Sequence, residues 1–360
     1  MKQRTCINIF IVIVILAIAV SLLVHFIHHS TKHEVSPIDT LNTKTTGTVT
    51  ISNDNNVQTS TSNQSVFSNM NTSLNIGRSD FGSILLPNGH VLIAGGHFNS
   101  STVSSGTEVY TSTGWQFAAP MKVPRGYHTV TAFANNTKVL AAGSSATSGQ
   151  QTAEVYNAVN NTWALTSINM LSPHIRHTAT LLANGQILIA GGYNISGGVN
   201  ASNYLISTAE LYINDSWTLL STRMTHSRAF HAAVLLNDGT VLVAGGGDGT
   251  PGAYPTAEIY NATSEKFTAV GSMQYRRAAF TLTLLPSGKV LAIGGADWSS
   301  GTYPLVCELY DPVTRTWSNN AMLNYGRSYH QSVLTSSFVL TMGGTNGNNN
   351  RLNSSEKYNL

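Results

Sequence analysis

A unit of about 50 residues recurs along this chain and constrains its fold more than any other feature. An apolar run ending in glycine occurs six times, with first glycines at Gly95, Gly143, Gly191, Gly245, Gly294 and Gly343. A Glu-x-Tyr motif follows every run, and in the first five units an aromatic residue and a methionine come next. Self-similarity at such a period predicts a repeat architecture, in which each unit is one supersecondary element.

Each unit has the pattern of a small antiparallel sheet. Short runs rich in Val, Ile and Leu are separated by turn dipeptides such as Asn88-Gly89 and Asp238-Gly239, which supply the positive φ angles of tight hairpins. We therefore expect four strands per unit: one after the opening residue, one ending in glycine, one with Glu-x-Tyr and one running from the aromatic residue to the methionine. One such sheet cannot bury both of its faces, so the units must pack around an axis.

These markers resemble those of kelch-repeat β-propellers. The resemblance rests on Gly-Gly, Glu-x-Tyr and Trp at near-regular spacing over roughly residues 64–360, with departures at Gly143-Ser144, His174 and Phe267. It implies an all-β, six-bladed kelch-type β-propeller. The expected blades span approximately 78–121, 125–170, 174–224, 228–273, 277–322, and 327–360 completed by 64–70.

The sixth unit stops at Leu360 without a fourth strand. Residues 64–70, with Phe67 and Met70, look like the end of such a strand. We therefore expect this N-terminal strand to complete the last blade and to close the ring, because an open sheet edge is a liability.

The N-terminal part predicts a membrane anchor. Residues 7–27 are almost entirely apolar and long enough to cross a bilayer, and Lys2 and Arg4 precede them. We expect a cytosolic tail (1–6), a transmembrane signal-anchor (7–27) and a Ser/Thr/Asn-rich stem (28–63), with the propeller extracellular or lumenal. The alternative is a cleaved signal peptide, which would make the protein secreted.

Composition excludes several classes of function. Only 10% of the residues are charged and the formal net charge is +3, which does not suggest nucleic-acid binding. Two cysteines, Cys6 and Cys307, cannot form a disulfide framework. We expect no cofactor, no metal and no nucleic-acid partner.

Strand connectivity predicts two different faces. The segments that open each unit and the loops after each Gly-Gly share one face, and the stem should leave from the other, so the first face is the distal face. Arginines that open units and aromatic residues near them or on the loops make this face a candidate surface for a protein or glycan ligand. The candidates are Arg78, Arg125, Tyr127, Arg228, Tyr254, Arg277, Trp298, Tyr303, Arg327 and Tyr329. The alternative for the arginines is a brace within each blade that pairs with the repeated Glu.

Four histidines share one position, three residues after the unit-opening residue. They are His128, His177, His231 and His330. A metal site is conceivable for four histidines, but we expect them to pack between adjacent blades as one repeated structural element. The six Glu-x-Tyr motifs are expected to be structural for the same reason, since catalysis does not need six copies.

A second resemblance raises an enzymatic alternative. Arg125-Gly126-Tyr127-His128 and Arg327-Ser328-Tyr329-His330 are similar to ligand segments of galactose-oxidase-type copper radical enzymes, whereas Phe81 stands where that family has its crosslinking cysteine. The sequence prediction is a non-enzymatic binding or scaffold ectodomain with no catalytic residues, and the alternative is a copper-radical oxidase-like enzyme.

Asn-x-Ser/Thr motifs are candidate glycosylation sites if the propeller lies outside the cytosol. They begin at Asn63, Asn71, Asn99, Asn135, Asn160, Asn194, Asn200, Asn214, Asn261 and Asn353.

Overall fold

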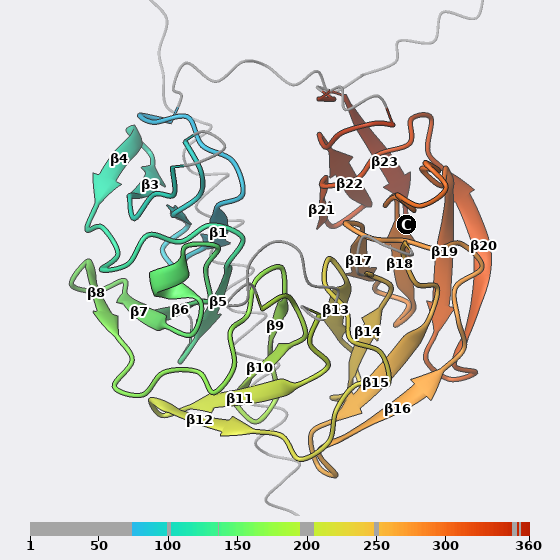
Figure 1. Ribbon diagram of the computed structural model, residues 1–360. Coiled ribbons are helices and arrows are strands. Elements are labelled where there is room, and N and C mark those ends of the chain that lie inside the picture. Colours follow the sequence, from blue (N-terminus) through green and yellow to red (C-terminus); the bar gives the residue numbers. More distant parts are fainter. Residues whose placement is uncertain are drawn as a thin grey trace, which may run out of the picture. The chain divides into compact units, whose positions relative to one another are not determined.

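A computed structural model shows six small antiparallel sheets that follow one another around a common axis (Figure 1). The structure describes residues 74–98, 102–135, 137–194, 205–247, 252–347, 351–352 and 354–360. Five sheets have four strands and the sixth has three, each strand pairing with its sequence neighbour. The predicted all-β, six-bladed propeller is confirmed.

The strands come in chain order, blade by blade. Blade 1 contains β1 (Gly82–Leu85), β2 (Val91–Ala94), β3 (Thr107–Thr111) and β4 (Gly114–Ala118). Blade 2 contains β5 (Thr129–Phe133), β6 (Lys138–Ala142), the 3₁₀ turn η1 (Thr147–Gly149), β7 (Ala153–Asn157) and β8 (Thr162–Leu165). Blade 3 contains β9 (Thr178–Leu181), β10 (Ile187–Ala190), β11 (Ala209–Ile213) and β12 (Ser216–Leu219).

The second half repeats this order. Blade 4 contains β13 (Ala232–Leu235), β14 (Val241–Ala244), β15 (Ala257–Asn261) and β16 (Lys266–Val270). Blade 5 contains β17 (Thr281–Leu284), β18 (Val290–Ile293), β19 (Val306–Asp311) and β20 (Thr316–Met322). Blade 6 contains β21 (Gln331–Leu334), β22 (Phe338–Met342) and β23 (Ser355–Asn359).

The repeated aromatic residues set the register between the third and fourth strands of a blade. The Tyr of Glu-x-Tyr lies directly opposite the aromatic residue of the next strand, and their ring centres are 4.8–5.3 Å apart. The pairs are Tyr110–Trp115, Tyr156–Trp163, Tyr212–Trp217, Tyr260–Phe267 and Tyr310–Trp317. Aromatic pairs directly opposite each other are a favourable cross-strand contact, which explains the fixed spacing of these markers.

The core lies between the blades rather than within one sheet. Between blades 2 and 3, Tyr212 and Trp217 of one blade join Leu140 and Met170 of the other in one buried cluster. The same arrangement recurs at the neighbouring junctions. Each sheet therefore depends on the next one to bury its apolar face, as the repeat required.

One marker of the repeat has a different environment from its equivalents in the other blades. In the first four blades the methionine lies four residues before the next unit-opening residue, and its side chain is buried. These methionines are Met121, Met170, Met224 and Met273. In the fifth blade, however, Met322 is 65% exposed, and Leu323, four residues before Arg327, takes the buried position at 8% exposure. The preceding strand is irregular between Val306 and Glu308, and a shift of this kind can change which side chain faces inward.

The predictions for the N-terminal part fall outside the described residues. These are the cytosolic tail, the anchor at 7–27, the stem and the closing strand at 64–70. Within the described ranges, no helix is long and apolar enough to span a membrane.

Candidate ligand-binding site on the propeller axis

Buried ion pairs brace five of the six blades. The unit-opening Arg pairs with the Glu of its own blade, as in Arg78–Glu108 (2.6 Å), Arg125–Glu154 (3.0 Å), Arg228–Glu258 (2.9 Å), Arg277–Glu308 (3.0 Å) and Arg327–Glu356 (2.7 Å). All five arginine side chains are inaccessible to solvent. Each guanidinium also donates to the carbonyl oxygen of the first glycine of its Gly-Gly or Gly-Ser pair.

The third blade uses a histidine for the same purpose. His174 Nδ1 lies 2.7 Å from the Gly191 carbonyl oxygen, and its Nε2 lies 3.3 Å from Glu210 Oε1. Ser172 adds a hydroxyl bond to the same carboxylate at 2.6 Å. Burial acts to raise the pKa of Glu210, but the bonds from His174 and Ser172 outweigh it and hold that pKa below its ordinary value.

These contacts correct the assignment of the arginines to a ligand-binding face. None of the five arginines exposes its guanidinium to an external partner, because each guanidinium is bonded inside its own blade. They are Arg78, Arg125, Arg228, Arg277 and Arg327. Of the two alternatives that the sequence left open, the structure shows the brace. The Glu of every Glu-x-Tyr motif is likewise the acceptor of a brace, which confirms its structural role.

The four histidines pack between adjacent blades, as predicted. Nε2 of His177, His231 and His330 lies 2.8–3.1 Å from a threonine hydroxyl on the first strand of the preceding blade. Burial lowers the pKa of His128 and His231 to about 3 and that of His330 to about 4, and nearby arginines add to this effect. These imidazole rings are therefore neutral in the folded protein, and each packs between its own blade and the preceding one. They are called the wedge histidines below.

A series of backbone hydrogen bonds runs around the axis. It is formed by the residue two positions after each unit-opening residue, and all six of these residues have a positive φ of 53–58°. They are Asp80, Tyr127, Arg176, Phe230, Ala279 and Tyr329, here called the axial ring. From Tyr127 onward, the N–H of each residue donates to the carbonyl oxygen of the one before it, which gives five hydrogen bonds, from Tyr127 to Asp80 (3.2 Å) through to Tyr329 to Ala279 (2.9 Å). Positive φ is costly for residues other than glycine, and such strain tends to occur at functional sites.

Arg176 lies among three aromatic side chains of this axial ring. Its guanidinium carbon is 3.5 Å from the ring centre of Tyr127, 4.8 Å from that of Phe230 and 5.3 Å from that of Tyr329. Its Nη2 also forms an ion pair with Asp80 Oδ1 at 3.2 Å. Cation–π attraction operates within about 6 Å, so three aromatic rings and one carboxylate together fix the position of the guanidinium.

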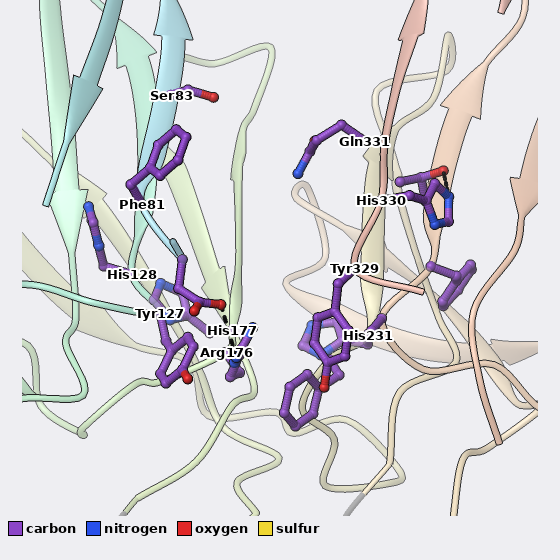
Figure 2. A pocket seen from close by; sticks show the side chains of 15 residues that line it. Phe81, Ser83, Tyr127, His128, Arg176, His177, His231, Tyr329, His330 and Gln331 are labelled. Carbon is purple, nitrogen blue, oxygen red and sulfur yellow. Dashed lines mark hydrogen bonds and ion pairs between the residues drawn. The ribbon is translucent and has the colours of Figure 1, made fainter. Parts of the chain in front are cut away.

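A cavity of about 560 Å³ opens at this position. All six blades contribute to its wall, which includes the axial ring together with Phe81, Ser83 and Gln331. Figure 2 shows Tyr127 and Arg176 on one side of the cavity, Tyr329 on the other, and Phe81 and Ser83 across from Gln331. Burial raises the pKa of Tyr329, which is still 43% exposed, so its hydroxyl is protonated at neutral pH.

The structure brings three of the predicted site residues together and separates two others. Tyr127 and Tyr329 line the cavity, and Trp298 stacks on Tyr329 with ring centres 6.0 Å apart. Tyr254 instead contacts His226, and Tyr303 packs beside Gly326 and Gly347; neither lines the axial cavity. Loop and opening segments share this face, as expected, since Trp298 on a loop also contacts Phe230.

Sequence reasoning missed Asp80, Arg176 and Phe230. A signal for them existed, because the position two residues after each opening residue is Asp, Tyr, Arg, Phe, Ala and Tyr in the six units. The positions that are nearly constant between repeats, Arg in five units and His in one, and Glu in all six, are the ones that brace the blades. The position that differs between repeats lies on the axis, where residues of all six blades line one cavity.

Five of the predicted glycosylation sites lie within the described residues. Four of them are exposed and lie in or beside turns, namely Asn135, Asn160, Asn214 and Asn261, and the fifth, Asn194, is half-buried. The others, Asn63, Asn71, Asn99, Asn200 and Asn353, fall outside the described ranges. Glycosylation itself stays a prediction.

Comparison with solved structures supports the fold. The chain resembles a fungal alcohol oxidase of the AA5 family, solved in complex with copper, with a TM-score of 0.65 and 19% identity over 78% of this chain and 62% of that one. It also resembles YjhT, with a TM-score of 0.62 and 14% identity over 80% of this chain and 96% of that one. No protein-family model matches the chain. No curated protein matches its sequence.

The comparison corrects one prediction. The sequence predicted that the chain is not an enzyme, and the likeness to an alcohol oxidase contradicts that prediction, since the same propeller there belongs to an enzyme. The chain spans 62% of the length of that oxidase. At 19% identity the likeness shows the fold alone.

Proposed function

We propose that the chain binds a saccharide in the axial cavity. The observation that carries this proposal is the position of Arg176, whose guanidinium lies across the ring of Tyr127 and pairs with Asp80. Side chains of Arg176 and Asp80 are 21% and 26% exposed, so both retain atoms that a ligand can reach. A charged donor and a charged acceptor therefore lie beside flat apolar surfaces.

This combination suits the chemistry of a sugar ring. One face of a pyranose carries C–H groups that pack on an aromatic ring, and its hydroxyls both donate and accept hydrogen bonds. Tyr329 offers a partly exposed aromatic ring, and Trp298 stacks on it. Arg176 can donate to a hydroxyl oxygen, and Asp80 can accept from a neighbouring hydroxyl.

The size of the cavity favours a small ligand over a flat protein partner. At about 560 Å³ it lies within the range of small-molecule sites, whereas a stable protein interface buries about 800 Å² on each partner. A short glycan whose terminal sugar lies in the cavity would match its volume and its polar groups. Protein binding to the surrounding loops is the competing outcome of the experiment.

The test is a screen of mono- and oligosaccharides against the full-length chain, with Trp fluorescence and calorimetry as readouts. Arg176→Gln removes the charge and should weaken saccharide binding at least tenfold, since hydrogen bonds to charged groups contribute about 1.5–3 kcal/mol. Arg223→Gln is the matched control, because Arg223 is exposed and outside the cavity wall. Equal affinity of both variants, or binding of a protein but no saccharide, would contradict the proposal.

Copper is the second candidate ligand, because one structural neighbour was solved with it. The residues here do not fit a copper ion. Nε2 of His330 is bonded to Thr281 Oγ1 at 3.1 Å between blades, and the guanidinium of Arg176 lies near both Tyr127 and Tyr329. A fixed positive charge beside those two rings opposes a second cation.

The location of the protein is a proposal that rests on sequence alone. We propose that residues 7–27 anchor the chain in a membrane and that the propeller lies on the non-cytosolic side, or that the protein is secreted if this segment is cleaved. A glycan ligand is consistent with that side of the membrane. Protease protection of the propeller in sealed vesicles would test the topology.

A further inference from the structure

A groove of about 670 Å³ lies between blades 2 and 3. It is formed at the other end of the strands from the axial cavity: Tyr127, before β5, lines the axial cavity, whereas Phe133, the last residue of β5, lines the groove. Blade 3 contributes the turns Asn184-Gly185 and Asn214-Asp215 to its wall. The groove is therefore separate from the proposed saccharide site.

The wall from blade 2 is a row of four residues that are direct partners across its four strands. They are Phe133, Lys138, Asn157 and Thr162, all on one face of the sheet. In the next row on this face, Val155 and Ala164 add apolar surface. Tyr212 of blade 3 packs edge-on against Phe133, with ring centres 5.9 Å apart. Polar groups thus lie beside apolar and aromatic side chains.

Lys138 has lost the partner that its equivalent in blade 5 retains. Lys138 and Lys289 each precede the apolar run of their second strand, and Asn157 and Asp311 each follow the Tyr of Glu-x-Tyr. Lys289 Nζ pairs with Asp311 Oδ2 at 3.0 Å. Asn157 cannot replace that carboxylate, and among the residues that the structure describes Lys138 forms no ion pair. Its ammonium group is therefore available to an external anion.

The turn before Lys138 is a second departure from the repeat. In blades 1, 3, 4 and 5 a buried leucine precedes a three-residue turn, namely Leu86, Leu182, Leu236 and Leu285. In blade 2, Phe133 takes this position, is only half-buried, and pairs with Lys138 across a four-residue turn. Two departures from the repeat thus meet in one groove, as departures from the repeat also meet in the axial cavity.

We propose that this groove binds a small carboxylate with an apolar body, such as an aryl-substituted acid. The carboxylate accepts from Lys138 Nζ and from the amide of Asn157, and the body packs on Phe133, Val155 and Ala164. Asn157 Oδ1 accepts from the Val159 N–H at 2.9 Å, which leaves the amide N–H groups of Asn157 as donors. Charge-assisted hydrogen bonds of this kind are the stronger ones.

The acidic residue of the wall does not neutralise Lys138. Asp215 accepts from the N–H of Ser167 (3.1 Å) and from its hydroxyl (2.5 Å), so its carboxylate already joins blade 3 to blade 2. The volume of the groove also lies within the range of small-molecule sites.

The first experiment compares two probes of nearly the same shape, phenylacetate and the neutral phenylacetamide, with the full-length chain. Ligand-observed NMR and calorimetry should show binding of phenylacetate, and binding of phenylacetamide weaker by about fivefold or more. Equal binding of the two probes, or binding of neither, would overturn the proposal. Loss of phenylacetate binding in Arg176→Gln with full binding in Lys138→Gln would place the acid in the axial cavity and would also overturn it.

The second experiment uses variants that the repeat itself supplies. Lys138→Gln should weaken phenylacetate binding about fivefold, less than the loss of a buried charged bond, because Lys138 is exposed. Asn157→Asp copies Asp311 and should weaken binding as much, since it gives Lys138 an internal partner. Lys289→Gln is the matched control and should leave the affinity unchanged. Full affinity in both Lys138→Gln and Asn157→Asp would contradict the proposal.

An N-linked glycan on Asn214 is the competing occupant, because Asn214 lines the groove and begins an Asn-x-Ser motif. Asn214→Gln removes that motif. Equal affinity of this variant and the unaltered chain for phenylacetate would support the proposal. Binding to Asn214→Gln alone would show that the glycan fills the groove, and would overturn it.

Discussion

The guanidinium carbon of Arg176 lies 3.5 Å from the centre of the Tyr127 ring, although the two residues belong to different blades. The same guanidinium reaches Asp80 of blade 1 and approaches Phe230 of blade 4 and Tyr329 of blade 6. One side chain thus connects five of the positions of the axial ring. This connection makes the axial cavity the best candidate for the functional site of the protein.

Replacing Arg176 by Lys should weaken ligand binding nearly as much as removing the charge. A lysine ammonium keeps the charge but has no planar group to stack on Tyr127 and no fork of donors for Asp80 and a ligand together. We expect at least tenfold weaker saccharide binding with Tm changed by less than about 3 °C. Calorimetric titration and thermal melts measure both quantities, and full affinity in Arg176→Lys would show that charge alone is sufficient.

Removing one brace should destabilise the whole propeller. Arg228→Ala leaves the carboxylate of Glu258 buried without its partner, and breaking a buried pair in this way costs about 3–5 kcal/mol. Chemical denaturation measures the loss.

Arg228→His is the control for this brace, because His174 takes the same place in blade 3. It should retain part of the lost stability. A cost below about 1 kcal/mol for Arg228→Ala would contradict the brace, by the same comparison with buried pairs.

The wedge histidines should make the propeller less stable in mild acid. Burial, reinforced by Arg228, lowers the pKa of His231 to about 3 in the folded protein, compared with 6.5 for an ordinary histidine. Below about pH 6.5 the unfolded chain therefore binds a proton that the folded chain does not, and the free energy of unfolding falls as the pH decreases. The stabilisation is complete above that pH and decreases by about 1.4 kcal/mol per pH unit for each such histidine.

A double variant isolates one wedge. His231→Phe with Thr178→Ala copies the junction of blades 4 and 5, where Phe280 and Ala232 share one buried cluster. Denaturant unfolding between pH 7 and pH 4 should show a slope shallower by about 1.4 kcal/mol per pH unit. An unchanged slope would mean that His231 is not responsible for this part of the pH dependence.

Two glycines with similar backbone angles should tolerate alanine very differently. Gly191 and Gly185 have φ of +65° and +85°, but an added Cβ would lie 2.5 Å from the Arg228 carbonyl oxygen at Gly191 and would meet nothing within 4 Å at Gly185. Both variants bear the backbone strain of about 1–2 kcal/mol, and only Gly191→Ala adds a clash between blades of about 1–3 kcal/mol more. Denaturation of the two variants in parallel measures the difference, and equal costs would contradict a close approach of the blades at Gly191.

Much of the fold could be predicted because its elements are set by local patterns. The turn dipeptides, the alternation of the strands and the pairing of Glu-x-Tyr with an aromatic residue all lie within one unit of about 50 residues. The histidine wedges could also be predicted, since residues at equivalent positions in repeats pack in equivalent places. The equivalence of the methionines did not extend to burial at Met322, because the irregular pairing of β19 with β20 moved the buried position to Leu323.

The candidate site was harder to predict for a physical reason. The sequence marked arginines that recur in five of the six units, but a charge that recurs at a buried position is usually part of the scaffold, as Arg228 with Glu258 shows. Tyr127 and Tyr329 were found because they are aromatic and lie near those arginines. Arg176 was not found, because the third unit opens with His174 and its arginine was not recognised as equivalent to the two tyrosines.

The amino-acid sequence by itself determined that this protein is a six-bladed propeller and which residues recur from unit to unit. Such information is local, since each unit contains its own turns and strands. Only the tertiary structure decided which single residues from different units meet. Asp80, Arg176 and Tyr329 are far apart along the chain, and they approach one another because rotation of the blades about one axis brings the same position of every unit to the centre.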